Sequence, residues 1–350
     1  MDVAKRVSIA AAERKGTTIM GGKLFNLPRM PRQDYLRREQ AIRAYLDRKL
    51  GGAYRIPRFY GDKPDFGDMD VIVPTRLDWD RLRAEIAADL GVTQTKYAGR
   101  VFSMAYDGLQ TDLFGVPERF VESTCNYMSF NDLGNLLGRL CRRFNLKYGE
   151  EGLAYIYRRA GNDHYRADLP VTQDFQRICA FLGLDYDGWV AGFATLTDVY
   201  EWVIVSPYFS VAPYLDDLEG TMERRVGKRP GIASFIDFLR VRGIDARPAF
   251  ADRMSYLPDI IAAFPETGLA EQVASERINE ERAGMLAARF SGKLVMRLRP
   301  ELSGPALSQF IVMFKQSFPD FEAFLLNTPA AEIEQRILAF QPPEDAKPPR

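Results

Sequence analysis

The apolar residues in the first half of the chain form short runs, at 71–73, 101–106 and 109–116. The first run is β-branched and ends at a proline, which is typical of a strand that stops there. The other two runs are separated only by Asp107 and Gly108, and an Asp-Gly pair between two apolar runs predicts a β-hairpin. This part of the chain therefore predicts a small sheet.

Apolar residues at helical spacing predict helices at 34–50, 78–90, 132–143, 232–241, 269–290, 306–318 and 330–340. We therefore expect an α+β chain, in which a small mixed sheet with flanking helices is followed by a mostly α-helical C-terminal domain. The segments that we expect are a basic helical segment at 1–54, a mixed-sheet domain at 55–165, a mainly helical domain at 166–340 and a disordered, proline-rich tail at 341–350.

Two aspartates open the first predicted strand. Side chains alternate between the faces of a strand, so Asp68 and Asp70 point to the same side, with Met69 between them pointing away. Two like charges held side by side are unfavourable unless a cation lies between them, and Mg²⁺ prefers oxygen ligands of this kind. The pair therefore indicates a metal site. Aspartate and glycine are also ordinary turn residues, so a solvated acidic turn is the alternative.

A third carboxylate favours the metal site. Asp112 lies inside the second strand of the predicted hairpin, among Leu109, Leu113 and Val116. A buried, unpaired carboxylate is costly or shifts its pKa until it is neutral, so this aspartate needs a partner. A sheet that brings it beside Asp68 would place three carboxylates around one or two divalent ions.

These motifs resemble the catalytic palm of the polymerase beta-type nucleotidyltransferases, in particular the family X DNA polymerases. The resemblance rests first on the sequence Gly-Asp-Met-Asp-Val at 67–71 and on the later strand with its lone aspartate. It extends over about residues 55–160, and it implies that 55–165 is the catalytic domain, formed by a palm and a nucleotide-binding helix.

A second segment of the resemblance carries residues for the nucleotide and the nucleic acid. Tyr127 and Met128 take the place of an aromatic pair of the family, and the helix that follows keeps the family's spacing of Asp132, Asn135 and Arg139. The resemblance implies that Tyr127, Met128, Asp132 and Asn135 bind the nucleotide. It also implies that Arg139 lies against the nucleic-acid minor groove. As an isolated pair, Asn135 and Arg139 would be read as a local hydrogen-bonding residue and a surface arginine.

The turn before the aspartates differs from the family. Family X chains have Gly-Ser there, followed by a longer, arginine-bearing loop. This chain has Gly61 and Asp62, with only six residues between Gly61 and Asp68. By resemblance Gly61, Asp62 and Lys63 would bind the nucleotide, with Lys63 as the nearest cation for its phosphates. No Gly-x-Gly helix-hairpin-helix signature is found in the sequence.

The predicted reaction is transfer of a nucleoside monophosphate from an NTP or dNTP to a hydroxyl, an EC 2.7.7 type of activity. Asp68, Asp70 and Asp112 would hold two Mg²⁺ ions, or Mn²⁺ in their place, and no histidine base is required. The favoured acceptor is the 3′ end of a DNA or RNA primer. The alternatives are transfer to a protein or small molecule, and an inactive binding module of the same fold.

Charge is balanced over the whole chain, with 47 Lys and Arg against 47 Asp and Glu, so it indicates no polyanionic partner. Residues 1–58 are different, because they hold fourteen basic residues against five acidic ones. The predicted helix at 34–50 carries five of these basic residues on one face, namely Arg37, Arg38, Arg43, Arg48 and Lys49, and the four arginines are the expected nucleic-acid contacts. They would follow a nucleic-acid backbone, or they form a solvated basic face.

The three cysteines lack CxxC spacing and are odd in number, which supports neither a disulfide framework nor a thiolate zinc site. The N-terminus lacks a signal-peptide pattern, and the longest weakly charged stretch, at 202–214, is too short to span a bilayer. We therefore expect a soluble, cytoplasmic or otherwise intracellular protein without a membrane partner.

Overall fold

The computed structural model describes residues 24–75, 78–159, 165–215 and 230–342. They divide into two compact units, Met1–Ile156 with Ala167–Leu269 as unit 1 and Tyr157–Arg166 with Ala270–Arg350 as unit 2. This division differs from the four segments expected from the sequence, which stay a prediction. Residues 1–23 of the expected N-terminal segment and residues 343–350 of the expected tail lie outside the described residues.

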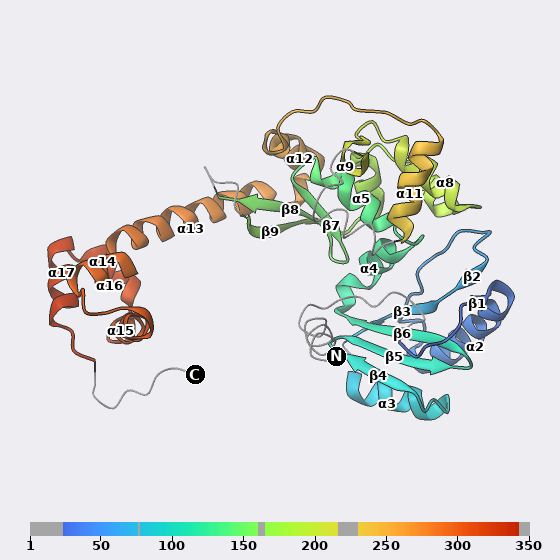
Figure 1. Cartoon of the computed structure of the whole chain (residues 1–350), viewed down its shortest axis with the longest axis horizontal. Helices are drawn as coiled ribbons and strands as arrows, with labels where there is room; N and C mark the ends of the chain where they lie inside the picture. Colours follow the sequence, from blue (N-terminus) through green and yellow to red (C-terminus); the bar gives the residue numbers. More distant parts are fainter. Residues whose placement is uncertain (1–23, 76–77, 160–164, 216–229, 343–350) are drawn as a thin grey trace, which may run out of the picture. The chain divides into compact units, whose positions relative to one another are not determined.

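The first part of unit 1 contains a four-stranded mixed sheet (Figure 1). The elements of this part of the chain are β1 (Met30–Pro31), α2 (Arg32–Leu50), β2 (Asp65–Phe66), β3 (Asp68–Pro74), α3 (Trp79–Asp89), β4 (Thr95–Ala98), β5 (Val101–Tyr106) and β6 (Leu109–Val116). Strands β1 and β2 pair with each other, and the other four form the mixed sheet. The strand order is β3-β6-β5-β4, in which β3 runs parallel to β6 and the other neighbours are antiparallel. The predicted hairpin, the predicted first strand and the mixed sheet are confirmed.

Alternation along the strands gives this sheet one face in the main core and a second face, called the polar face, that carries the carboxylates. At the other end of the same strands this second face buries Ile72 and Val116 against Cys125. Met69, Val71 and Val73 of β3 are buried in one core with Ile42 of α2 and Ile86 of α3. Both helices therefore cover the same face of the sheet. The residues between them, Asp68 and Asp70 among them, point to the opposite face.

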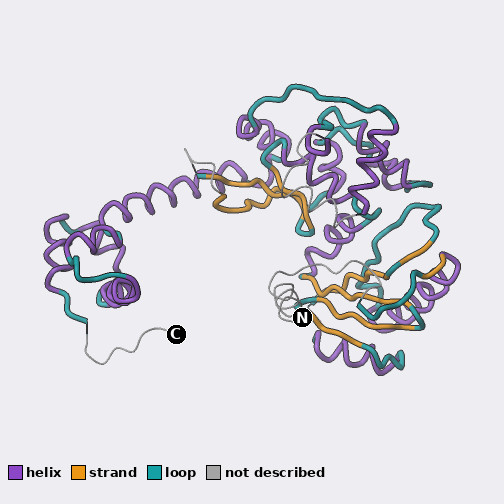
Figure 2. The backbone as a smooth tube through the Cα atoms, viewed as in Figure 1, coloured by secondary structure: helices purple, strands orange, loops and turns teal. Residues whose placement is uncertain are grey.

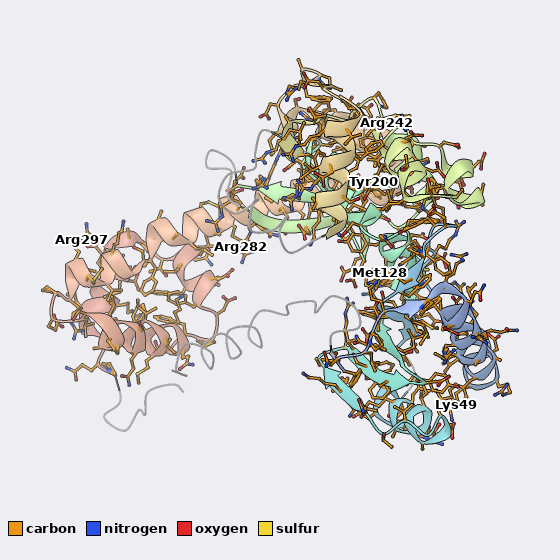
Figure 3. All side chains as sticks on the ribbon, turned by 45° about the vertical axis from the view of Figure 1, so that its right-hand side comes forward. Lys49, Met128, Tyr200, Arg242, Arg282 and Arg297 are labelled. Atoms are coloured by element: carbon orange, nitrogen blue, oxygen red, sulfur yellow. The ribbon has the colours of Figure 1, made fainter. Side chains whose placement is uncertain are left out.

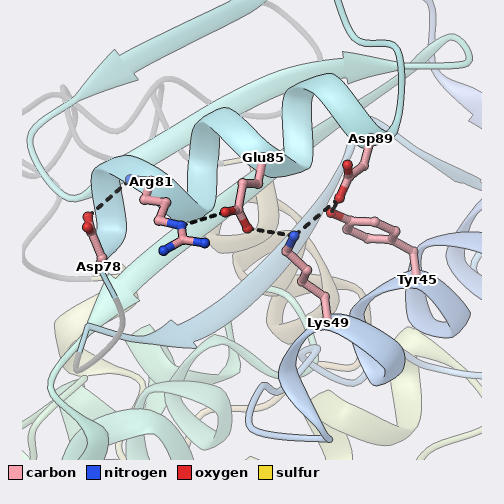
Figure 4. Close-up of polar contacts among 6 residues, drawn as sticks. All are labelled: Tyr45, Lys49, Asp78, Arg81, Glu85 and Asp89. Atoms are coloured by element: carbon pink, nitrogen blue, oxygen red, sulfur yellow. Dashed lines mark hydrogen bonds and ion pairs between the residues drawn. The ribbon is translucent and has the colours of Figure 1, made fainter.

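A polar network joins α2 to α3 along their exposed edge (Figure 4). Lys49 Nζ lies 2.6 Å from Glu85 Oε2 and 3.3 Å from Asp89 Oδ2, and Tyr45 donates a hydrogen bond to Asp89 Oδ2. Arg81 pairs with Glu85 within α3. Exposed pairs of this kind contribute little individually, so the apolar core holds the two helices to the sheet.

A second group of elements follows the mixed sheet. It consists of η1 (Glu118–Phe120), α4 (Val121–Met128), α5 (Leu133–Arg142), β7 (Leu146–Gly149), β8 (Gly152–Arg158) and β9 (Tyr165–Thr172). The predicted helix at 132–143 is confirmed as α5. The three strands form a separate sheet, in the order β7-β8-β9, that was not predicted.

The remainder of unit 1 is helical. Its elements are α6 (Phe175–Phe181), α7 (Tyr186–Ala191), α8 (Leu196–Ile204), α9 (Ala212–Leu215), α11 (Pro230–Val241), η2 (Arg253–Tyr256), α12 (Leu257–Ala263) and η3 (Pro265–Thr267). Figure 2 shows that the described residues after β9 contain helices and loops but no strand. The expected α+β class with a mostly helical C-terminal part is confirmed.

Unit 2 is built mainly from five helices. They are α13 (Leu269–Arg289), α14 (Gly292–Leu298), α15 (Gly304–Gln316), α16 (Phe321–Asn327) and α17 (Ala330–Ala339). Phe290, Phe310 and Phe314 are buried at its centre. On its surface Arg282 and Arg297, both labelled in Figure 3, pair with carboxylates of α16 and α17 at 2.6 Å. Among the described residues, no helix combines the length and the apolar character that crossing a membrane requires.

Candidate active site

Three carboxylates meet on the polar face of the mixed sheet. Asp70 of β3 and Asp112 of β6 are register partners across the two parallel strands, and Asp68 lies two residues before Asp70 on the same face. One oxygen atom from each of the three carboxylates can be chosen so that all lie within 4.8 Å of one another. The structure therefore brings together the three aspartates that the sequence singled out.

Burial and neighbouring carboxylate charges raise the pKa of Asp68 and that of Asp70. Burial, followed by the charge of Asp112, raises the pKa of Asp68 to about 6, although Lys63 acts in the opposite direction. Burial and then the charges of Asp68 and Asp112 raise the pKa of Asp70 well above its ordinary value. Three such groups close together favour any positive charge placed between them.

Asp112 is held by its neighbours in a way that leaves one oxygen atom available. Gln110 Nε2 donates a hydrogen bond of 2.8 Å to Asp112 Oδ2. Burial raises the pKa of Asp112, and hydrogen bonds from Ser103 and Gln110 partly offset this. The other oxygen, Oδ1, is buried and has no hydrogen-bond partner among the described residues. A buried carboxylate oxygen of this kind needs a cation, so the residues present fit a divalent metal ion.

Backbone hydrogen bonds within the chain hold the turn that is expected to bind phosphate. Gly61 N donates to Phe193 O at 2.8 Å, and Asp62 N donates to Ala194 O at 2.7 Å. Lys63 is partly buried, and its ammonium group donates to Asn131 Oδ1 at 3.1 Å. Burial lowers the pKa of Lys63, while the Asp68 charge acts to raise it, so this cation lies within electrostatic reach of the triad. Of the three residues, only Lys63 presents a group suited to phosphate.

The residues of the second segment, expected to bind the nucleotide and the nucleic acid, lie on α4, on α5 and at Asp132, the N-cap of α5. Met128 is the last residue of α4 and is labelled in Figure 3. Asn135 Nδ2 donates to Asp132 Oδ1 at 2.9 Å, and Tyr127 Oη donates to Asn135 Oδ1 at 3.4 Å. Arg139 Nη1 donates to Pro213 O at 2.9 Å. The roles of these five residues in binding stay predictions.

A large cavity of about 1880 Å³ opens along α5 and β7. Tyr127, Asn135 and Arg139 line it, whereas the three carboxylates, all of them described residues, do not. Cations outnumber carboxylates in the cavity wall: the cations are Arg100, Arg119, Arg139, Arg142, Arg143, Lys147 and Arg253, and the carboxylates are Glu150, Glu151, Asp168 and Asp252. Lys147 pairs with Asp168 and Arg100 with Glu150. Sequence reasoning missed this basic wall because its residues come from separate segments of the chain, among them η1, α5, β7 and η2.

The basic face of α2 is largely neutralised by its own helix. Arg37 and Arg38 both pair with Asp34, and Arg43 pairs with Glu39 at 2.7 Å. Arg48 is exposed, with no ion pair to another described residue. Their predicted contact with nucleic acid stays a prediction, and the pairing favours the alternative of a solvated face.

Scans against protein-family models and against curated proteins give no match. Among solved structures, the chain is similar to two complexes of Leishmania infantum polymerase beta. The ternary gap complex is 14% identical, with a TM-score of 0.34 over 45% of this chain and 69% of that chain. The ternary P/T complex is 13% identical, with a TM-score of 0.36 over 52% of this chain and 90% of that chain.

Both structures are of polymerase beta, the family that the motifs around Asp68 and Asn135 resemble.

Proposed function

We propose that the chain is a metal-dependent nucleotidyltransferase that transfers a nucleoside monophosphate from an NTP or dNTP to a hydroxyl group. The observation that carries this proposal is the carboxylate triad, in which Asp112 Oδ1 is buried without a hydrogen-bond partner among the described residues. A cluster of three neighbouring carboxylates has no structural benefit by itself, because they repel one another. It is suited to holding divalent ions against a triphosphate.

The chain's own residues have separable roles in this reaction. Asp68 and Asp70 would hold both ions, and Asp112 would complete the site on the side of the attacking hydroxyl. Lys63 would lie against the phosphates that leave. When bound, Mg²⁺ or Mn²⁺ ions supply the positive charge that phosphoryl transfer requires.

The bond changes are those of an in-line displacement. The hydroxyl oxygen of the acceptor forms a bond to the α-phosphorus, the bond from that phosphorus to the bridging β-oxygen breaks, and pyrophosphate leaves. The hydroxyl proton passes to solvent. Alignment and charge neutralisation account for most of the rate in such reactions, so a histidine base is not needed.

The cationic cavity supports a nucleic acid as the acceptor. Arginine and lysine side chains bind phosphates, and exposed aromatic rings stack with bases. Arg119 and Arg142 are exposed in the cavity wall, which also contains Tyr127. The 3′ end of a DNA or RNA primer is thus the acceptor that the surface supports best.

The acceptor class is tested by measuring pyrophosphate release from each of the four NTPs and dNTPs, with a primer, with a primer-template and with neither. The proposal predicts release only when a nucleic acid with a free 3′ hydroxyl is added. The same primer with a 3′-deoxy end is the matched control and is expected to give no release. Equal release without nucleic acid would show that the acceptor belongs to another class.

A further inference from the structure

Arg58 joins three segments of unit 1 that lie far apart in the sequence. Its backbone N–H donates to Ser129 Oγ at 3.0 Å, and its carbonyl accepts from Phe130 N at 2.7 Å. Its guanidinium group donates to Trp189 O and Val190 O, both at 2.8 Å. We call residues 58–63 the turn, residues 129–131 the hinge and residues 189–194 the brace.

The guanidinium group of Arg58 lies among aromatic rings. Its central carbon is 4.9 Å from the centroid of Phe130 and 5.0 Å from that of Trp189. Cation–π contacts and two charge-assisted hydrogen bonds to the end of a helix make this a specific site for arginine. A lysine would keep the charge but lose the paired hydrogen bonds.

The brace also holds the turn through backbone groups. Phe193 O and Ala194 O accept the N–H groups of Gly61 and Asp62, as described above. A Cβ atom on Gly61 would lie 3.0 Å from Ala194 O, and one on Gly192 would lie 2.9 Å from Arg58 Nη2. The two segments approach so closely that neither glycine has room for a side chain.

The hinge connects α4 to α5, and its backbone is unusual. Phe130 and Asn131 both have positive φ angles, 58° and 61°, which L-residues other than glycine rarely adopt. Phe130 is buried against the brace, with its ring centroid 4.8 Å from that of Phe193. Asn131 accepts a hydrogen bond from Lys63 of the turn. The hinge is therefore fixed by both the turn and the brace.

We propose that the brace preorganises the nucleotide site, with Arg58 as a positioning residue. It holds the turn that carries Lys63 and the hinge that precedes α5 in one arrangement before any nucleotide binds. This proposal rests on the proposed function, since it assigns Lys63 to the triphosphate. It predicts that the turn and the hinge do not move when substrate binds, because contacts within the chain itself hold both segments.

The test combines amide hydrogen exchange of the turn with nucleotide kinetics in the full-length protein. In the wild type, the amide groups of Gly61 and Asp62 are expected to be protected from exchange without ligand. Their protection should rise by less than about twofold when nucleotide and Mg²⁺ are added. In Arg58→Ala, their exchange should accelerate at least about tenfold, and KM for the nucleotide should rise by about tenfold while kcat changes by less than about threefold. Arg58→Lys should give an intermediate result.

Arg55→Ala is the matched control, because Arg55 pairs with Glu122 outside the brace, and its exchange and KM should equal those of the wild type. Arg58→Lys keeps the test decisive if Arg58→Ala does not fold, since it disturbs the same contact more gently. Protection of Gly61 and Asp62 that arises only after nucleotide binds would overturn the proposal. So would unchanged exchange in both Arg58 variants. If amide exchange changes as predicted but neither the wild type nor any variant transfers nucleotide, the role of the brace is upheld and the proposed function is contradicted.

Discussion

Asp112 of β6 lies directly opposite Asp70 of β3, in register across two parallel strands. A sheet normally avoids like charges at such a pair, because they destabilise it. Here the pair is reinforced by Asp68 on the same face, and Asp112 Oδ1 has no hydrogen-bond partner among the described residues. Repulsion within this arrangement lowers the stability of the metal-free protein, and bound cations would relieve it.

The metal-free protein should become less stable as the pH rises. A folded-state pKa of about 6 for Asp68, above its unfolded value, means that the folded protein binds more protons. The stabilisation this provides is fully present below about pH 4 and is lost as the pH rises through about 6. Between pH 5 and 7.5 the free energy of urea unfolding should therefore fall by roughly 1–3 kcal/mol in the presence of a chelator.

Asp70→Asn should reduce that fall and raise the stability of the metal-free protein at pH 7.5, because it removes one of the repelling charges. The exposed Asp259, changed to asparagine, is the control and should leave the pH dependence as it is. Excess Mg²⁺ should stabilise the wild type and not Asp70→Asn. A wild-type unfolding free energy that rises between pH 5 and 7.5 would contradict the assigned repulsion.

Gln110 is expected to position Asp112 for metal binding. It is buried, its amide N–H₂ group donates to Asp112 Oδ2, and its amide oxygen accepts from Leu24 N at 3.2 Å. Gln110→Met keeps the shape but removes the donor, and should weaken the apparent affinity for Mg²⁺ by about tenfold or more. Titration of activity with Mg²⁺ measures this, with the exposed Gln94→Met as the control. An unchanged Mg²⁺ midpoint would show that Asp112 needs no such support.

Ribonucleotides should be accepted at a meaningful rate. Met128 stands where the resembling family has an aromatic ring, and a flexible thioether confines a ribose less firmly than a flat ring does. The difference in kcat/KM between a dNTP and its NTP should stay within about 100-fold, and Met128→Phe should widen it. Competition between labelled NTP and dNTP gives the ratio directly. Strict deoxynucleotide selectivity in the wild type would argue against this role for Met128.

The salt dependence of binding should locate the nucleic acid on the cavity wall and not on α2. Replacing Arg119 and Arg142 with glutamine should reduce the slope of log affinity against log salt by about 0.7–0.9 per lost phosphate contact. The same change at Arg37, Arg38, Arg43 and Arg48 should leave the slope almost unchanged, because three of the four are paired with carboxylates of α2. A large decrease of this slope in the α2 variant would instead show that α2 contacts the nucleic acid.

Local signals allowed much of this fold to be predicted. The Asp107-Gly108 pair sets the hairpin, whose strands begin and end at the predicted residues. The lone Asp112 within an apolar strand indicated a partner, and β3 supplies it. The sheet of β7, β8 and β9 was missed, because β9 contains Pro170 and its pairing has no comparable turn signature.

The cavity wall and the brace could not be predicted from the sequence. Arg58 and Trp189 are 131 positions apart, and neither lies in a motif. Nothing local indicates that the N–H groups of Gly61 and Asp62 are bonded to the chain itself. Contacts of this kind depend on how separate helices pack, which periodicity does not specify.

The central claim is tested most directly by incorporation of a radiolabelled nucleotide into a primer, comparing the wild type with Asp112→Asn over a range of Mg²⁺ concentrations. The substitution removes one ligand charge at nearly constant shape, so folding should be preserved. We predict Mg²⁺-dependent incorporation by the wild type, abolished by a chelator, and a rate for folded Asp112→Asn that is lower by at least about 100-fold. Equal incorporation by the folded variant and the wild type would contradict the assignment of the triad as the catalytic centre.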